Sequence, residues 1–200
     1  SVGGDLNAYT GKEDTVYYAS ILKEHLPRAI DILSDIVFHS TFPQQEIDKE
    51  VAVICDEIES YNDSPSELIY DEFENMIFEG HPLGHNILGK SERLRKYTTG
   101  DAQRFTKKYY RPENAVFFIY GDINFERAVR LIQKATNDFE ECYPLIDVKQ
   151  SLVMPEYKAR ELVVEKNTHQ AHVMIGTRAY NIHDERRITL YLLNNILGGP

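Results

Sequence analysis

The stretch that most constrains this chain runs from Pro43 to Asn62, PQQEIDKEVAVICDEIESYN, and its pattern predicts one long amphipathic helix. Apolar residues recur at alternating intervals of four and three positions, which is the spacing of a buried helical face. These residues are Ile47, Val51, Ile54, Ile58 and Tyr61. Such a stripe requires other parts of the chain to cover it.

Two acidic residues of this predicted helix, Glu50 and Glu57, stand seven positions apart. Because an α-helix turns by about 100° per residue, seven positions return to within about 20° of the starting direction. Both carboxylates therefore share a face, beside the apolar stripe. Burying the edge of a carboxylate is costly unless a cation, a metal ion or hydrogen-bond donors compensate it. The pattern leaves two interpretations: a pair that serves a site, or two side chains that bend out to solvent.

Composition and charge limit the class of protein. With 42% hydrophobic and 11% aromatic residues, 200 residues suit one large domain, or one domain and part of another. The net charge of −10 argues against a nucleic-acid partner and against docking on anionic lipid, since both require basic surface. No apolar run reaches about 18 residues, so no membrane-spanning helix is expected.

The remaining elements predict the α+β class, with helices packed on one face of a mainly antiparallel sheet. A hairpin is expected from Asp5–Thr10 and Thr15–Ile21, joined by a four-residue turn. A buried strand is expected at Asn114–Tyr120, and two more at Glu161–Lys166 and Gln170–Thr177. The other predicted helices are Pro27–His39, Pro65–Phe78, Ser91–Tyr97, Thr99–Tyr110, Phe125–Thr136 and Glu185–Leu197. A capping box of Ser64 and Glu67 is expected to begin the second of these, and Thr99 to cap the fourth.

The domain organisation is predicted from a change of character near residues 137–155, where charges are mixed and no period is clear. A strand pair followed by a helix is predicted on both sides of this stretch, which hints at two related halves. We therefore expect a first domain over residues 1–140 that lacks its N-terminal part, a linker over 141–158, and the beginning of a second, similar domain over 159–200.

Histidines and cysteines offer weaker candidates for chemistry. His81 and His85 stand four apart, but the Pro and Gly between them favour a loop with two exposed histidines over a metal-binding helix. Cys55 and Cys142 form no C-x-x-C pattern and are expected to be two free thiols, with Cys55 toward the polar side of its helix.

The first strand of the hairpin offers a binding hypothesis. Leu6, Asn7, Ala8 and Tyr9 form a short strand whose small residue lets another backbone approach closely. An exposed edge of this type accepts an extended peptide by strand addition. Spacing alone favours the alternative, an ordinary strand of a sheet.

Four blocks follow one another in a distinctive order: GGDLNAYTGKEDTVYY, VAVICDEIESYNDSPSELIYDEF, HPLGHNILG and YRPENAVFFIYGDI. They resemble the inverzincin zinc metallopeptidases of the pitrilysin/insulinase class, most closely the subgroup of mitochondrial processing peptidase and its bacterial relatives. Two later stretches, QAHVMIG and NNILGGP, resemble the start of that family's second, structurally similar domain. The resemblance covers essentially the whole chain and implies a processing-peptidase-like fold.

The resemblance also implies a zinc site, built from an H-x-x-E-H motif on one helix and a distant Glu. Val53–Ile58 matches the block that carries this distant ligand, so Glu57 matches the ligand itself. Glu50 matches the acidic residue that supports a ligand histidine from outside the metal's own ligand set. The peptide substrate would lie antiparallel along the edge strand that matches Leu6–Tyr9.

The chain departs from the family in one respect, because it contains no H-x-x-E-H. We expect that motif upstream of Ser1, which would make the chain a fragment that is itself inactive and without bound zinc. The intact protein is then expected to be a zinc endopeptidase, with a second homologous domain or subunit closing a chamber around peptides. The alternatives are a non-catalytic partner subunit of the same family and a peptide-binding module that uses only the edge strand. The acidic chain favours the cytoplasm, with the periplasm as the alternative.

Overall fold

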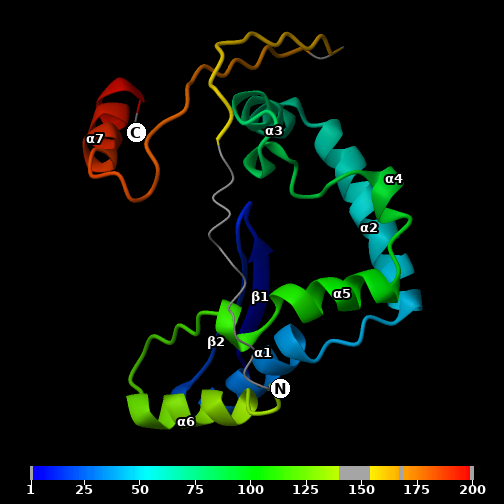
Figure 1. Cartoon of the computed structure of the whole chain (residues 1–200), viewed down its shortest axis with the longest axis vertical. Helices are drawn as coiled ribbons and strands as arrows, with labels where there is room; N and C mark the ends of the chain where they lie inside the picture. Colours follow the sequence, from blue (N-terminus) through cyan, green and yellow to red (C-terminus); the bar gives the residue numbers. More distant parts are fainter. Residues whose placement is uncertain (1, 140–153, 167–168, 199–200) are drawn as a thin grey trace. The chain divides into compact units, whose positions relative to one another are not determined.

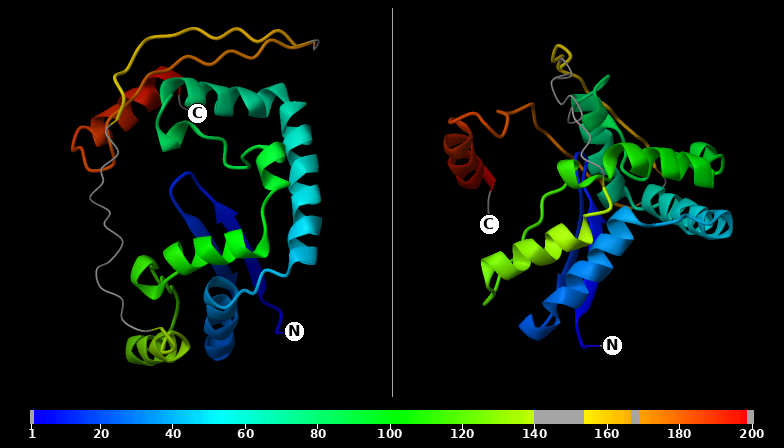
Figure 2. Two further views of the ribbon diagram at one scale, coloured as in Figure 1. Left: turned by 45° about the vertical axis from the view of Figure 1, so that its right-hand side comes forward. Right: turned by 60° about the horizontal axis from the view of Figure 1, so that its bottom comes forward.

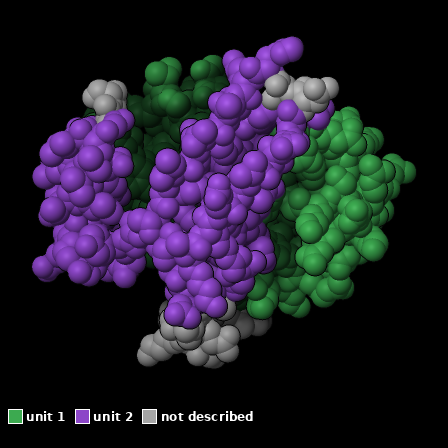
Figure 3. All heavy atoms as spheres, turned by 90° about the horizontal axis from the view of Figure 1, so that it is seen from above, with its two compact units in different colours: residues 1–62, 86–153 green, residues 63–85, 154–200 purple. Residues whose placement is uncertain are grey.

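The computed structural model describes residues 2–139, 154–166 and 169–198, and these form two compact units. The first unit is Ser1–Asn62 with Asn86–Val153, and the second is Asp63–His85 with Met154–Pro200 (Figure 3). Helices and one small antiparallel sheet make up the structure (Figure 1), which confirms the predicted α+β class. The predicted domain boundaries stay a prediction, and most of the expected linker lies outside the described residues.

The first unit opens with the predicted hairpin. Strands β1 (Asp5–Thr10) and β2 (Thr15–Ser20) pair antiparallel, with Asp5 opposite Ser20. The Gly11 N–H donates to the Asp14 carbonyl at 2.8 Å and closes the turn. The turn is local and the flanking residues favour strands, so sequence places this element within one residue at each end.

Helix α1 (Leu26–Phe38) lies against β2 and covers one side of the hairpin (Figure 2). Its proline lies in the first turn, where the missing N–H costs nothing. The buried residues Leu26, Ile30 and Ser34 recur every four positions and form the face that packs. Helix α6 (Phe125–Ala135) contacts α1 and buries Ala128, while Asn124 caps its first turn by accepting the Arg127 N–H at 2.8 Å.

Helix α2 (Gln44–Asn62) is the predicted central helix, and its apolar stripe is half-buried as expected. Cys55 corrects the prediction that it faces the polar side, because it is 3% exposed and the most buried residue of the helix. The reason is tertiary: helix α4 (Ser91–Leu94) lies over the flank of α2 that carries Cys55. Helix α5 (Thr99–Tyr109) follows α4.

Two helices begin at Thr99 and Pro65 as predicted, but their caps differ from the prediction. Thr98, not Thr99, is the N-cap of α5, and it forms a capping box with Asp101. Helix α3 (Pro65–Ile77) begins as expected, but the Ser64 side chain makes no cap bond and lies 3.2 Å from the Ser66 hydroxyl. The choice between neighbouring hydroxyls depends on rotamers that the sequence pattern does not specify.

The other three segments that were predicted to be strands do not form strands in the structure. Asn114–Tyr120 begins in a short 3-10 turn, η3 (Pro112–Asn114), and continues extended, with Val116 and Tyr120 each 94% exposed. Glu161–Lys166 and Gln170–Thr177 are likewise extended and form no strand. A strand needs a neighbour to complete its ladder of hydrogen bonds. Within the described part of the chain, the only such ladder joins β1 and β2.

The second unit contains α3, the 3-10 turn η2 (Pro82–Gly84) and α7 (Arg187–Gly198). Arg178 ties its parts together: Nε donates to the Ile77 carbonyl at 2.8 Å, and Nη1 donates to the Pro155 carbonyl. The same guanidinium lies 5.5 Å from the Phe78 ring and 5.7 Å from the Tyr157 ring. Arg178 therefore links the C-terminal end of α3 to residues more than seventy positions away in the chain.

Candidate functional site

Glu50 and Glu57, the predicted carboxylate pair, both lie on α2 and both are exposed. Seven residues of helix separate them by about 10 Å along the axis. Neither carboxylate forms a hydrogen bond or ion pair with any residue that the structure describes. Their carboxylate oxygens are therefore solvated and free to accept hydrogen bonds. The free-energy cost of burying a carboxylate does not arise at either residue.

A carboxylate oxygen is a suitable zinc ligand, so Glu57 fits one position of a zinc site. A complete site needs at least three protein ligands. Across residues 2–139, 154–166 and 169–198, no group of three or more His, Cys, Asp and Glu residues is placed to hold a metal ion. Glu57 therefore fits zinc as one member of a larger ligand set. Glu50 lies on the same face of the helix, about two turns away.

The two loop histidines have local roles. His81 caps the short turn η2, and its Nδ1 accepts the Leu83 N–H at 3.2 Å. His85 ends the same turn, and its own N–H donates to the Pro82 carbonyl at 3.1 Å. This geometry confirms the predicted loop, but only His85 is exposed as expected, because His81 is half-buried.

The candidate peptide-binding strand has one open edge. Leu6, Asn7, Ala8 and Tyr9 are all exposed on β1, which pairs with β2 on one side and with no other described strand. In an antiparallel pair, ladder bonds alternate along each strand. Counting from the bonded pair Gly11–Asp14, Ala8 directs its N–H and C=O toward the open edge. The Ala8 N–H donates to the Asn7 Oδ1 at 2.8 Å and is not used by β2.

The open edge is flanked by an aromatic pair. Tyr9 and Tyr18 lie on one face of the hairpin with ring centroids 6.4 Å apart, and their side chains are 58% and 43% exposed. On the opposite face, Tyr17 and Tyr110 bring their hydroxyls to 3.4 Å. Partial burial, and then the hydrogen bond with Tyr110, raise the pKa of Tyr17, so the Tyr17 phenol stays neutral at any physiological pH.

The structure groups the predicted site residues into two separate sets, the carboxylates on α2 and the exposed residues on β1. Glu50 and Glu57 share one helix, and Leu6–Tyr9 share one strand. Among the described residues, no hydrogen bond or ion pair joins α2 to β1.

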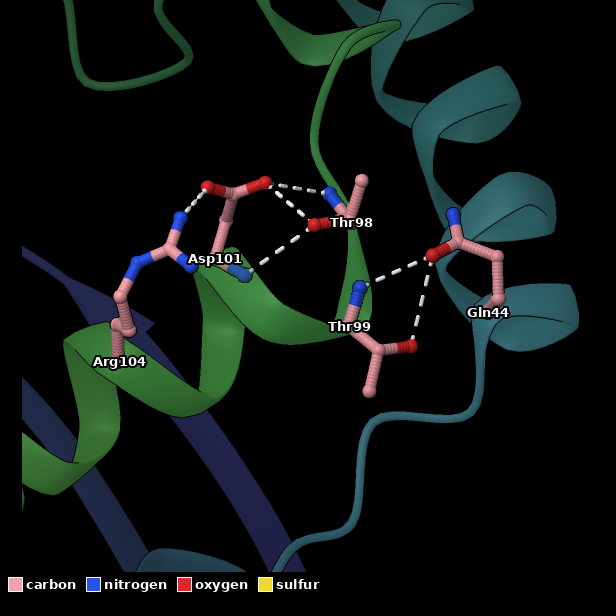
Figure 4. Close-up of polar contacts among 5 residues, drawn as sticks. All are labelled: Gln44, Thr98, Thr99, Asp101 and Arg104. Carbon is pink, nitrogen blue, oxygen red and sulfur yellow. Dashed lines mark hydrogen bonds and ion pairs between the residues drawn. The ribbon is translucent and has the colours of Figure 1, made fainter.

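One group of residues near α2 is absent from the sequence-based prediction. Gln44, the first residue of α2, contacts Thr99, the first residue of α5 (Figure 4). The capping signal Thr98-x-x-Asp101 marks the start of α5, but no sequence signal connects it with a glutamine 55 positions away.

Comparison with known proteins identifies the family. A family model described as "Insulinase (Peptidase family M16)" matches residues 1–91, and one described as "Peptidase M16 inactive domain" matches residues 96–200. The chain belongs to peptidase family M16. The resemblance noted in the sequence is thereby confirmed, and the assignment at family level is to zinc metallopeptidases.

Relatives of this M16 chain agree with the assignment. "Uncharacterized zinc protease YmxG" of Bacillus subtilis is 34% identical over 198 residues, which cover 99% of this chain and 47% of that protein. "Mitochondrial-processing peptidase subunit beta" of Dictyostelium discoideum is 29% identical over 99% of this chain and 42% of its own length. The chain thus spans about half the length of the curated relatives it matches.

A solved structure supports the fold. "The crystal structure of a protease from Helicobacter pylori" superposes with a TM-score of 0.64 at 23% identity, and covers 72% of this M16 chain and 36% of that one. Separately, no helix among the residues described has the length and apolar character needed to cross a membrane.

Proposed function

We propose that the full-length protein is a zinc-dependent endopeptidase in which Glu57 is a zinc ligand. The observation that carries this proposal is the exposed Glu57 carboxylate on α2, unengaged by any described residue, in a chain of family M16. When bound, zinc supplies Lewis acidity, which polarises a peptide carbonyl and activates water for hydrolysis. The remaining ligands and the general base belong to an H-x-x-E-H motif, which these 200 residues do not contain.

Glu50 and β1 have separate roles in this proposal. Glu50 accepts the ring N–H of a zinc-bound histidine, which holds that ring in one tautomer and orientation. The open edge of β1 binds the peptide through the Ala8 carbonyl and through the Ala8 N–H, which exchanges its bond to Asn7 Oδ1 for one to the peptide. Backbone bonding tolerates many side chains, so unfolded peptides are the expected substrate class.

The first experiment replaces Glu57 with Gln in the full-length protein. This change keeps the shape of the side chain and removes its charge, so zinc content and peptidase activity are expected to fall together. Glu59→Gln is the matched control, since Glu59 is exposed on the same helix at a position that faces away. Full zinc content in the Glu57→Gln protein would show that another residue is the ligand. Glu50→Gln is expected to weaken zinc binding by about 10–100-fold.

The second experiment separates the enzyme from a non-catalytic subunit of the same family. The coding sequence upstream of Ser1 is expected to specify H-x-x-E-H, and its absence would overturn the enzyme proposal. The 200-residue chain alone is expected to hydrolyse no peptide.

The open edge of β1 also supports a peptide-binding module as a second candidate. Ala8→Pro removes the edge donor and is expected to abolish binding of an extended peptide to the 200-residue chain, whereas Ala8→Ser keeps the donor and the binding. Equal peptide binding by the two variants would exclude the edge as the binding surface.

The proposed partner is a second homologous domain or subunit that closes a chamber around the peptide, a proposal supported by the match of residues 96–200 to a second family domain. The proposed compartment is the cytoplasm, on the basis of the acidic charge of −10 and two cysteines. Cell fractionation distinguishes it from the periplasm.

A further inference from the structure

The N-terminal end of α2 is held by hydrogen bonds to the start of α5. The Gln44 Oε1 accepts the Thr99 N–H at 2.9 Å, and the Thr99 hydroxyl donates to the Phe42 carbonyl at 2.7 Å. Gln103 Nε2 adds a bond of 3.3 Å to the Thr41 carbonyl. We call the contacts of Gln44 and Thr99 with each other and with Phe42 the Gln44 clamp (Figure 4 shows Gln44 and Thr99).

Gln44 uses both ends of its amide. Its oxygen satisfies one of the N–H groups that the first turn of α5 leaves without an intrahelical partner. Its Nε2 donates to Asp48 Oδ1 at 2.8 Å and to the Tyr97 carbonyl at 3.4 Å. This arrangement needs both a donor and an acceptor at the end of the side chain, and the glutamine amide supplies both.

Backbone strain marks the same place. Phe42 has a φ of +53°, in the left-handed region that a bulky side chain rarely adopts. Such a conformation persists where the surroundings hold it, and it concentrates at sites where position matters. The Thr99 hydroxyl holds the Phe42 carbonyl, so the clamp maintains the turn that directs the chain into α2.

Beyond its N-terminal end, most of α2 is exposed or half-buried, with α4 on its flank and further contacts made by Tyr61 and Asn62 at its C-terminal end. Cys55 is its only buried residue, and Val51 and Cys55 of α2 line a cavity of about 220 Å³ together with Leu94 and Tyr97. With so little of its length buried, the helix depends for its direction on contacts at its ends, of which the clamp is the N-terminal set. Glu50 and Glu57 lie about 9 and 20 Å beyond Gln44 along the axis, so a small tilt at the clamp displaces both carboxylates.

We propose that Gln44 is a positioning residue, which sets the direction of α2 and thereby the place of Glu50 and Glu57 in the zinc site. This inference rests on the proposed function for the roles of the two carboxylates. It assigns a role to residues that touch neither the metal nor the peptide.

The test uses the full-length protein and three variants. Gln44→Ala removes the clamp, Thr99→Val removes the hydroxyl contacts with Phe42 and Gln44 but keeps the backbone bond to Gln44, and Gln45→Ala is the matched control. Gln45 is exposed and has no partner among the described residues. Zinc affinity is measured by chelator competition, well below the melting temperature, so that a loss of stability alone does not change it. Amide exchange over residues 44–58 is measured in the zinc-free protein.

Gln44→Ala is expected to weaken zinc affinity by about tenfold, the lower end of the range for residues that orient metal ligands, and Thr99→Val by less. Gln45→Ala is expected to leave zinc affinity unchanged. Equal zinc affinity in Gln44→Ala and Gln45→Ala would overturn the inference. If Gln44→Ala does not fold, Thr99→Val carries the same comparison.

A failure of the proposed function is recognised separately. If Glu57→Gln keeps its zinc, Glu57 is not a ligand, and the amide exchange then decides whether the clamp exists. Faster exchange over residues 44–58 in Gln44→Ala than in Gln45→Ala supports the clamp, and equal exchange overturns it.

Discussion

Residues 5–38 and 161–198 each contain two stretches rich in strand-forming residues, followed by a helix, yet among the residues described in each range only the first forms a ladder. In the first, α1 buries Leu26 and Ile30 beneath the hairpin. In the second, α7 buries none of its residues, and Ile175 of the extended segment is 92% exposed. A two-stranded ladder is marginal unless a helix or a third strand covers it. The comparison shows that strand-forming residues become a strand only where another element packs against them.

The strongest test of this comparison uses two isoleucines in the 200-residue chain. Ile30 is 7% exposed and Ile175 is 92% exposed, so the same truncation removes buried contacts at one and none at the other. Ile30→Ala is expected to lower the free energy of unfolding by about 2–5 kcal/mol. Ile175→Ala is expected to change it by less than about 0.5 kcal/mol. Urea unfolding measures both. A similar loss in both variants would mean that residues 170–177 are packed in solution.

The second test asks what holds the second unit, in which Ile77 is the only buried side chain among the described residues. Arg178 donates to two backbone carbonyls, so Arg178→Gln is expected to destabilise this unit by about 1–3 kcal/mol. Arg160→Gln is the control, because Arg160 pairs with Glu79 at 2.5 Å on the surface, where an ion pair contributes less than about 1 kcal/mol. Amide exchange of α3 measures the local effect. Equal exchange in the two variants would assign Arg178 no special role.

The third test compares helix starts in the two units. Thr98 caps α5, whereas Ser64 makes no cap bond to α3. Thr98→Ala is expected to cost about 1 kcal/mol in the free energy of unfolding, and Ser64→Ala only a few tenths. Chemical denaturation measures the difference. If Ser64→Ala costs as much as Thr98→Ala, the predicted capping box with Glu67 forms in solution after all.

The smallest expected effect is on the stability of the folded chain at low pH. The Arg186 side chain and then its backbone N–H donate to Asp184 and hold its pKa at about 2, below the usual 3.8. The folded chain therefore binds this proton less readily than the unfolded chain, so the stabilisation is complete above pH 3.8 and is lost as the pH falls through about 2. Asp184→Asn is expected to flatten stability against pH in that window. Asp31→Asn, at an exposed position of α1, is the control.

Asp101 titrates in the same direction in the first unit, where hydrogen bonds from Thr98 lower the pKa of its carboxyl. Asp101→Asn is expected to flatten the dependence of stability on pH on the acid side of the usual carboxyl pKa. An unchanged slope in both Asp184→Asn and Asp101→Asn would mean that these carboxylates titrate alike in the folded and unfolded chains.

Much of the fold was predictable because its signals are local. The period of the apolar stripe placed α2 to within one residue, and the turn at Gly11–Asp14 placed the hairpin. The carboxylate pair was found by helical geometry, and its assignment to a zinc site came from resemblance to the family. That assignment stays a prediction, as does the binding of peptide along Leu6–Tyr9.

Other features were beyond the sequence because they depend on residues far away in the chain. The burial of Cys55 follows from α4, and the contact of Gln44 with Thr99 joins positions 55 residues apart. Val116 and Tyr120 belong to an apolar run that was predicted to be buried, yet both are exposed. An apolar run does not specify which other part of the chain covers it.

The sequence alone therefore determined where helices and the hairpin turn occur, because capping, turn chemistry and helical period act over a few neighbouring residues. The tertiary structure alone decided which faces are buried, which extended segments pair and how α2 is held. These depend on hydrogen-bond and packing partners that a local pattern does not contain.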